Sequence, residues 1–345
     1  MWSPDQYVKE IFGGVTPSEQ FQAASREEWR EWRERLRSRF VSLLGGPPAE
    51  QPKITPIVLE TEDCGDYTRQ RIQIETYPGL HMPVYVLVPH ERGTRTGAVI
   101  ACHGHGHGYG SKDIVGLTPD GAKKTGGDSG YQKDFAVALA RKGYIVLAPE
   151  LLGFGDRRLE SDAKADASNS CHRLSTFLLA MGQTMAGYRV FETLRCVDYL
   201  LTREDVDADR IGCMGISGGG LVCSFAAAID DRISAAVVSG YTNTFKDSIL
   251  SIPHCIDNYV PGLSLVAEMP DVIGLIAPKP LLIEAGTRDP IFPVNATLEA
   301  FEHMQRVYRL LGNEDRLTLD LFDGDHEISG QVAYDWFEQV WDERV

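Results

Sequence analysis

Apolar positions recur with two different periods along the chain, and the first period to appear is helical. Steps of three and four residues separate Trp29, Trp32, Leu36, Phe40 and Leu43. This spacing predicts an amphipathic helix, which a capping box at Ser25 and Glu28 would start and the sequence Gly45 to Pro48 would end. The pattern does not indicate whether this helix packs on the same chain or on another subunit.

The period changes to two after residue 54, which indicates strands. Alternating or continuous apolar runs occur at 57–59, 71–75, 84–88, 97–102, 144–148, 211–214, 233–238, 280–285 and 317–322. Helical patterns occur at 135–141, 188–202, 221–229, 294–311 and 330–340. The first three runs predict an antiparallel meander, and the later alternation predicts a mostly parallel, doubly wound sheet with helices on both faces.

Composition and charge restrict the partners of this chain. The 345 residues include 43% apolar and 24% charged residues, and the formal net charge is -15. This acidic balance argues against nucleic acid or an anionic membrane as a partner, because both require basic patches. The amino terminus has neither a basic region nor an apolar core of the signal-peptide kind, so we expect a cytoplasmic protein. Seven cysteines without a C-x-x-C pair predict free, mostly buried thiols.

A glycine-rich turn between a strand and a helix carries the clearest chemical signal. Residues 215–219 read G-I-S-G-G, which fits the G-x-S-x-G elbow that lifts a serine hydroxyl above a sheet. The apolar run before it and the alanine-rich helical run after it supply the strand and helix that such an elbow requires. We therefore predict Ser217 as a nucleophile.

A serine nucleophile needs a base and a group that orients the base. Catalytic groups in such sheets follow the carboxyl ends of strands. Asp289 follows the run 280–285, and His326 follows the run 317–322. We predict Asp289 as the orienting acid and His326 as the base, with Asp323 and Asp325 as rival acids.

The string H-G-H-G-H-G at 103–108 allows two interpretations. In the first, its glycines turn backbone N–H groups toward the serine, so that His105 and Gly218 donate to an oxyanion. In the second, His103, His105 and His107 face one metal ion. We prefer the first, because the glycines disfavour a regular extended strand.

The chain resembles the α/β-hydrolase superfamily, and three motifs carry the resemblance: G-I-S-G-G, T-R-D-P and G-D-H-E. Within it, the antiparallel start, the H-G-x-G loop and the final H-E look like the dienelactone hydrolase and acetyl xylan esterase neighbourhood. The resemblance implies an α/β-hydrolase fold, Ser217, Asp289 and His326 as a triad, a carboxylic ester substrate and no cofactor. The acetyl xylan esterase family carries R-G-Q where this chain has G-F-G-D-R-R, and dienelactone hydrolases use cysteine as the nucleophile.

The expected organisation is an N-terminal helical extension at 1–50 and a catalytic domain at 51–345, with loop insertions at 108–131 and 241–276. We expect a serine esterase that acts through an acyl-enzyme on small, short-chain esters. A serine peptidase or amidase, a carbon-carbon hydrolase and the metal-dependent hydrolase are the alternatives. Candidate substrate contacts are Tyr109, Phe154 and Tyr241, with Tyr131 beside them. A homo-oligomer is possible.

Overall fold

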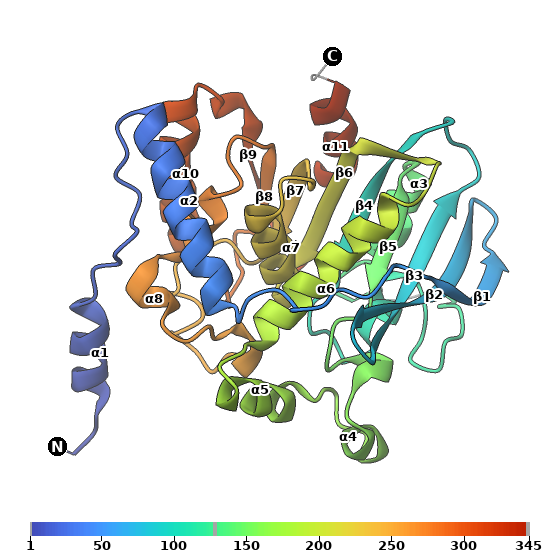
Figure 1. The fold of residues 1–345 in the computed structure, drawn as a ribbon, viewed down its shortest axis with the longest axis horizontal. Coiled ribbons are helices and arrows are strands. Elements are labelled where there is room, and N and C mark those ends of the chain that lie inside the picture. Colours follow the sequence, from blue (N-terminus) through green and yellow to red (C-terminus); the bar gives the residue numbers. More distant parts are fainter. Residues whose placement is uncertain (1, 127–129, 343–345) are drawn as a thin grey trace.

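Nine strands of the described residues, 2–126 and 130–342, form one sheet in the computed structural model (Figure 1). Residues 1, 127–129 and 343–345 lie outside the described residues; 127–129 belong to the predicted insertion 108–131. The strands are β1 (Ile57–Asp63), β2 (Tyr67–Tyr77), β3 (Leu80–Pro89), β4 (Thr96–Cys102), β5 (Ile145–Pro149), β6 (Val206–Ile216), β7 (Ala235–Ser239), β8 (Leu281–Gly286) and β9 (Leu317–Phe322).

The strand order is β1-β2-β3-β5-β4-β6-β7-β8-β9. The pairings β1–β2, β2–β3 and β3–β5 are antiparallel, and those from β5 through β4 to β9 are parallel. The predicted fold class, a mostly parallel sheet with antiparallel N-terminal strands, is confirmed. Because the parallel strands end at one edge, the loops after β4, β6, β8 and β9 meet there.

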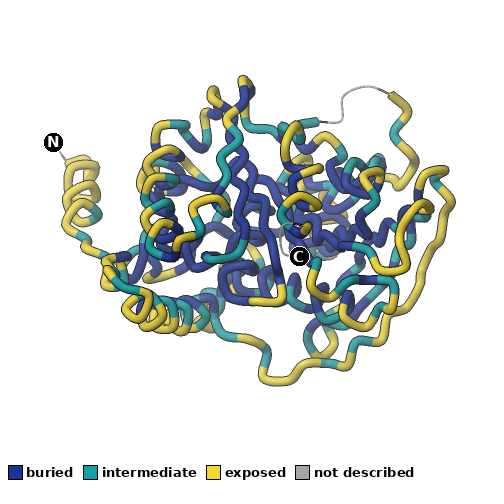
Figure 2. The backbone as a smooth tube through the Cα atoms, turned by 90° about the horizontal axis from the view of Figure 1, so that it is seen from above, coloured by how far each residue is buried: buried dark blue, intermediate teal, exposed yellow. Residues whose placement is uncertain are grey.

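Helices cover both faces of the sheet, and each face has its own hydrophobic core. Buried residues fill the interior of the molecule (Figure 2). The larger core lies under α2 (Arg26–Leu43), α6 (Met185–Leu200), α7 (Gly218–Ile229), α9 (Met269–Gly274) and α10 (Val294–Leu311). The smaller core lies under α3 (Phe135–Arg141) and α11 (Ala333–Asp342) on the opposite face. The sheet edge that carries the loops is thus held between two packed layers.

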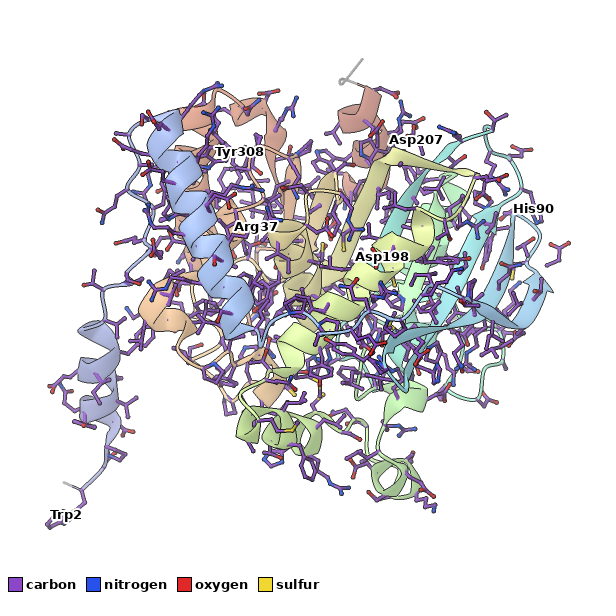
Figure 3. All side chains as sticks on the ribbon, in the orientation of Figure 1. Trp2, Arg37, His90, Asp198, Asp207 and Tyr308 are labelled. Carbon is purple, nitrogen blue, oxygen red and sulfur yellow. The ribbon has the colours of Figure 1, made fainter. Side chains whose placement is uncertain are left out.

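The N-terminal helix α2 packs on the same chain. Phe40 contacts Phe225 of α7 edge-on, with ring centroids 4.8 Å apart. Arg33 and Arg37 reach Asp231, with N–O distances of 2.6 and 3.1 Å, and Arg37 is labelled in Figure 3. The predicted cap is half formed: the Ser25 hydroxyl accepts from the Glu28 N–H, but the Glu28 carboxylate accepts from the Ala24 N–H and not from Ser25.

A short helix that the apolar pattern did not reveal precedes α2. Helix α1 (Asp5–Gly13) has no buried residue. It projects from the body (Figure 2), with Trp2 near its tip (Figure 3). Its side chains Tyr7, Val8 and Ile11 are exposed.

The predicted starts of α6 and α11 are wrong, and local hydrogen bonds explain both. Helix α6 begins at Met185 rather than 188, because the Thr184 side chain caps it by accepting from the Gly187 N–H at 2.9 Å. Helix α11 begins at Ala333 rather than 330, because the Gly330 N–H donates to a Glu284 carboxylate oxygen at 2.8 Å.

The segment between β5 and α6 contains α4 (Glu160–Lys164) and α5 (Cys171–Ala180), neither of which is among the helical patterns found in the sequence. Other short elements are the 3-10 turns η1 (Gly110–Ile114), η2 (Gly155–Arg157), η3 (Ile256–Asn258) and η4 (Glu314–Arg316), and helix α8 (Leu263–Val266). All seven cysteines are free, and five are buried, as predicted. In the described part of the chain, no helix combines the length and apolar character needed to cross a bilayer.

We predict that Phe40→Ala lowers the free energy of unfolding by about 3 to 5 kcal/mol, because it leaves a cavity against Phe225. Urea denaturation followed by circular dichroism measures this change. The control Glu34→Ala alters an exposed position of the same helix and should change stability by less than about 0.5 kcal/mol. Equal stability of the two variants would contradict the packing of α2 on this chain.

Candidate active site

The serine of the elbow lies where β6 meets α7, in a strained backbone conformation. Ser217 has φ 57° and ψ -125°, a region that a non-glycine residue occupies at a cost of about 1 to 3 kcal/mol. Its N–H donates to the Ser239 carbonyl at 3.0 Å, which anchors the turn to the end of β7. The strand-turn-helix context predicted around Ser217 is therefore present.

The glycines on either side of Ser217 are required by close backbone contacts. A Cβ on Gly215 would lie 2.2 Å from the Gly219 carbonyl oxygen, and a Cβ on Gly219 would lie 2.0 Å from the Cys102 carbonyl oxygen. Real Cβ atoms do not approach this closely, so any other residue would force the elbow open. The G-x-S-x-G pattern is thus a steric requirement of this turn.

The predicted acid and base meet as the sequence order suggested. His326 Nδ1 lies 2.7 Å from Asp289 Oδ2. The other oxygen of Asp289 accepts the N–H groups of Ile291 and Phe292, at 2.8 and 3.0 Å. Because both carboxylate oxygens are engaged, Asp289 is held in one orientation toward the imidazole.

Two aromatic rings fix the plane of the His326 imidazole. Tyr131 and Phe292 stack on it, each with a centroid distance of 5.6 Å and with interplanar angles of 24° and 19°. His326 Nε2 is buried and has no hydrogen-bond partner among the described residues. With Nδ1 held by Asp289, Nε2 is the nitrogen left available for proton transfer.

The serine and the histidine adjoin the same short segment at the end of β7. The Ser239 carbonyl accepts from Ser217, as described above, and the next residue, Gly240, faces His326. A Cβ on Gly240 would lie 3.1 Å from the imidazole Nδ1 and Cε1 atoms. The rival acids point elsewhere: Arg288 contacts both Asp323 and Asp325.

The loop after β4 places the side chain of His105 beside Gly218, the other predicted oxyanion donor. A Cβ on Gly218 would lie 2.9 Å from the His105 imidazole, so these residues are neighbours. The Gly218 N–H opens α7, where the first N–H groups have no partner within the helix. None of the hydrogen bonds found among the described residues uses the His105 N–H. Gly104 and Gly106 donate instead to Gln132 Oε1 and the Tyr131 hydroxyl, at 2.7 and 3.0 Å, which anchors the loop.

The three histidines of this loop do not converge on one point, so the metal interpretation of His103, His105 and His107 was wrong. His103 is buried with Nδ1 2.7 Å from the Gly104 carbonyl and Nε2 accepting from the Leu151 N–H. Burial lowers the pKa of His103 to about 3, so its imidazole is neutral. His107 is exposed and contacts Tyr109.

His105 turns toward a buried carboxylate that no motif in the sequence singles out. Its Nε2 lies 3.0 Å from Asp257 Oδ2, and Arg189 Nη1 lies 2.5 Å from the same oxygen. Burial alone would lower the pKa of His105, but Asp257 raises it to about 9. Asp257 lies in η3 and Arg189 lies on α6, so only the tertiary fold joins them.

The predicted substrate contacts separate into two groups. Phe154 and Tyr241 are each 1% exposed: Phe154 packs on His103 and His105, and Tyr241 packs on Phe225 and Phe292. Both belong to the core, which removes them from the candidate substrate contacts. Tyr109 is half-buried and stays a prediction.

Sequence reasoning also missed His254, in the insertion 241–276. Its ring contacts Phe292 edge-on at 5.7 Å, and its Nε2 atom is buried without a partner among the described residues. Burial lowers the pKa of His254, and the nearby His105 and His326 act in the same direction. As a single histidine in an irregular stretch, it had no periodic or motif signal.

The sheet order and the strained elbow define a protein of the α/β-hydrolase fold, as the sequence motifs predicted. Residues 3–319 match the Abhydrolase family. This match spans most of the chain, so the chain belongs to the Abhydrolase family.

This chain is similar to known proteins both in sequence and in structure. "Putative hydrolase YtaP" of Bacillus subtilis (strain 168) is 28% identical over 286 residues, which are 81% of this chain and 89% of that protein. A "putative acetyl xylan esterase" from Bacteroides fragilis NCTC 9343 superposes with a TM-score of 0.83 at 16% identity, covering 99% of this chain and 95% of that one. A glucuronoyl esterase from Solibacter usitatus gives a TM-score of 0.65 at 16% identity, with coverages of 96% and 98%.

We predict that Gly240→Ala lowers kcat for any ester that the protein hydrolyses by about 100-fold, because the new methyl group displaces His326. The control is Gly46→Ala, since Gly46 also has a positive φ but no atom lies within 4 Å of the position that its Cβ would take. Both variants should lose about 1 to 2 kcal/mol of stability. A kcat that falls equally in both, measured by initial rates, would contradict the contact with His326.

Proposed function

We propose that this chain is a serine-dependent carboxylic ester hydrolase. The observation that carries the proposal is the Asp289–His326 pair. His326 Nδ1 lies 2.7 Å from the Asp289 carboxylate, and His326 Nε2 is buried without a partner among the described residues. This imidazole lies beside the end of β7, to which Ser217 is anchored. A base oriented in this way next to a serine on a strained turn is what nucleophilic acyl transfer requires.

In the proposed reaction, His326 Nε2 takes the Ser217 hydroxyl proton as the oxygen attacks the ester carbonyl. Asp289 stabilises the imidazolium that forms. His326 then returns the proton to the leaving alkoxide, and the alcohol departs from an acyl-enzyme. Water, deprotonated by the same nitrogen, releases the acid and restores Ser217.

The tetrahedral oxyanion would accept hydrogen bonds from the backbone N–H groups of Gly218 and His105. Each such donor typically contributes about 3 to 4 kcal/mol to the transition state. The anchors of the His105 loop on Gln132 and Tyr131 support this role, because preorganised donors lose nothing to reorientation during the reaction. Tyr131 therefore supports both the loop and the His326 ring.

The names of the similar structures support an ester substrate, since they include acetyl xylan and glucuronoyl esterases and a methylesterase. We propose short acyl groups, acetyl above all, because Tyr131, Phe292 and His254 crowd the surroundings of the base. A cytoplasmic location and homo-oligomer formation stay predictions. No contact in the described residues favours a peptide or a carbon-carbon bond over an ester.

We predict that Ser217→Ala lowers kcat for p-nitrophenyl acetate by at least about 10⁴-fold, because the acyl-enzyme cannot form. Asp289→Asn should cost about 10⁴-fold through loss of the imidazole orientation. The matched control, Ser38→Ala, changes an exposed serine of α2 and should leave the rate unchanged. EDTA should have no effect; full activity of Ser217→Ala would refute the serine mechanism.

We predict that kcat/KM falls from p-nitrophenyl acetate and butyrate to octanoate and decanoate. Phe292→Ala, which removes one ring beside His326, should shift the optimum toward longer acyl chains while lowering kcat. Initial rates over the series measure both effects. Faster turnover of decanoate than of acetate by the wild type would contradict a short acyl site.

A further inference from the structure

Four potential metal ligands from three separate segments meet behind the His105 loop. They are His105, Cys171 at the start of α5, and Cys255 and Asp257 around η3, and one ligand atom of each lies within 4.8 Å of every other. Cys171 and Asp257 are buried, whereas His105 and Cys255 are partly exposed. We refer to these four residues as the thiol-histidine cluster.

The donors of this cluster are directed inward. His105 Nε2 is buried and makes no hydrogen bond of good geometry among the described residues, although it lies 3.0 Å from Asp257 Oδ2. A buried imidazole nitrogen aimed at a carboxylate and two sulfur atoms has the surroundings of a metal ligand. The serine mechanism leaves this nitrogen and both thiols without a role.

Outer contacts hold the anionic members of the cluster in place. Arg189 reaches Asp257 Oδ2 at 2.5 Å and Cys171 Sγ at 3.2 Å, and Asn258 donates to Asp257 Oδ1 at 2.9 Å. Arg189 is itself fixed by two bonds to the Leu152 carbonyl, at 3.0 and 2.7 Å. Donors that bond to the ligands in this way orient ligands and tune metal affinity.

Charge balance is compatible with a divalent cation despite the buried guanidinium. Zinc binding would release to water the protons of both thiols and the proton that Asp257 favours on the His105 imidazole. The two thiolates and one carboxylate then carry three negative charges, which a divalent ion and Arg189 together neutralise. A neutral buried cluster avoids the cost of an uncompensated charge. Arg189 then acts as the counterion of the third anionic ligand.

We propose that the thiol-histidine cluster binds one Zn²⁺ ion. Two sulfur atoms, one imidazole and one carboxylate form a four-ligand set of the kind that zinc takes in tetrahedral geometry. Tetrahedral bonds of about 2.0 to 2.3 Å place ligand atoms about 3.3 to 3.8 Å apart. The ligand atoms of the cluster now lie within 4.8 Å of one another, so they need to move closer by about 1 Å to bind the ion. The ion would tie the loop that carries His105 to α5 and η3.

This site differs from the rejected arrangement of His103, His105 and His107, because it takes only His105 from that loop. It also takes no part in the proposed ester hydrolysis, in which His105 contributes its backbone N–H. Zinc content and esterase activity are therefore separate measurements, and failure of one leaves the other standing.

The test reduces the full chain with a phosphine and removes the phosphine under anaerobic conditions. It then loads the chain with excess ZnCl₂, followed by gel filtration and elemental analysis. We expect about one zinc ion per chain in the wild type and in Ser217→Ala. Cys171→Ser combined with Cys255→Ser should lose the bound zinc. The control Cys64→Ser alters a partly exposed cysteine outside the cluster and should retain it.

Loading with Co²⁺ identifies the ligands independently. The wild type and Cys64→Ser should show thiolate-to-cobalt charge-transfer absorption, and the double variant should not, while circular dichroism confirms that all are folded. Zinc retention that survives loss of both thiols would overturn the proposal. Two results for the wild type would also overturn the proposal. The first is a protein that retains no zinc although mass spectrometry shows both Cys171 and Cys255 reduced. The second is a disulfide between Cys171 and Cys255 under the same reducing conditions.

Discussion

The backbone of Ser217 is the constraint on which the rest of this site depends. Its φ is positive, at the junction of β6 and α7. The turn around it is close-packed, because the carbonyls of Gly219 and Cys102 occupy the positions that a Cβ on Gly215 or Gly219 would need. Strain of this kind persists where the surrounding packing over-determines it. Here the two cores on either side of the sheet, including the N-terminal helix α2, supply that packing.

The proposed base, His326, is positioned by different means: two aromatic rings stack on it, and a carboxylate with both oxygens in hydrogen bonds faces it. Tyr131 and Phe292 both stack on the His326 ring. Asp289 uses both oxygens, one toward the imidazole and one to accept backbone N–H groups. These contacts come from loops far apart in sequence. The Tyr131 hydroxyl also accepts the Gly106 N–H, so the proposed base and the proposed oxyanion loop share one support.

The chain order Ser217, Asp289, His326 was readable because each residue follows an apolar strand, and strand ends of a parallel sheet converge. Local periodicity likewise indicated the sheet and most helices. It could not indicate Asp257 or Arg189, which meet His105 only through tertiary contacts. It also misassigned Phe154 and Tyr241, because an aromatic residue in a loop has the same local pattern whether it lines a pocket or fills the core.

Covalent labelling of the nucleophile tests the central claim most directly. The protein would be treated with a fluorophosphonate, which reacts with activated serine hydroxyls, and then analysed by intact mass and peptide mapping. The account predicts one adduct per chain, located on Ser217, with loss of esterase activity in proportion, and no adduct in His326→Ala. An active esterase that takes no adduct, or takes it at another residue, would contradict it.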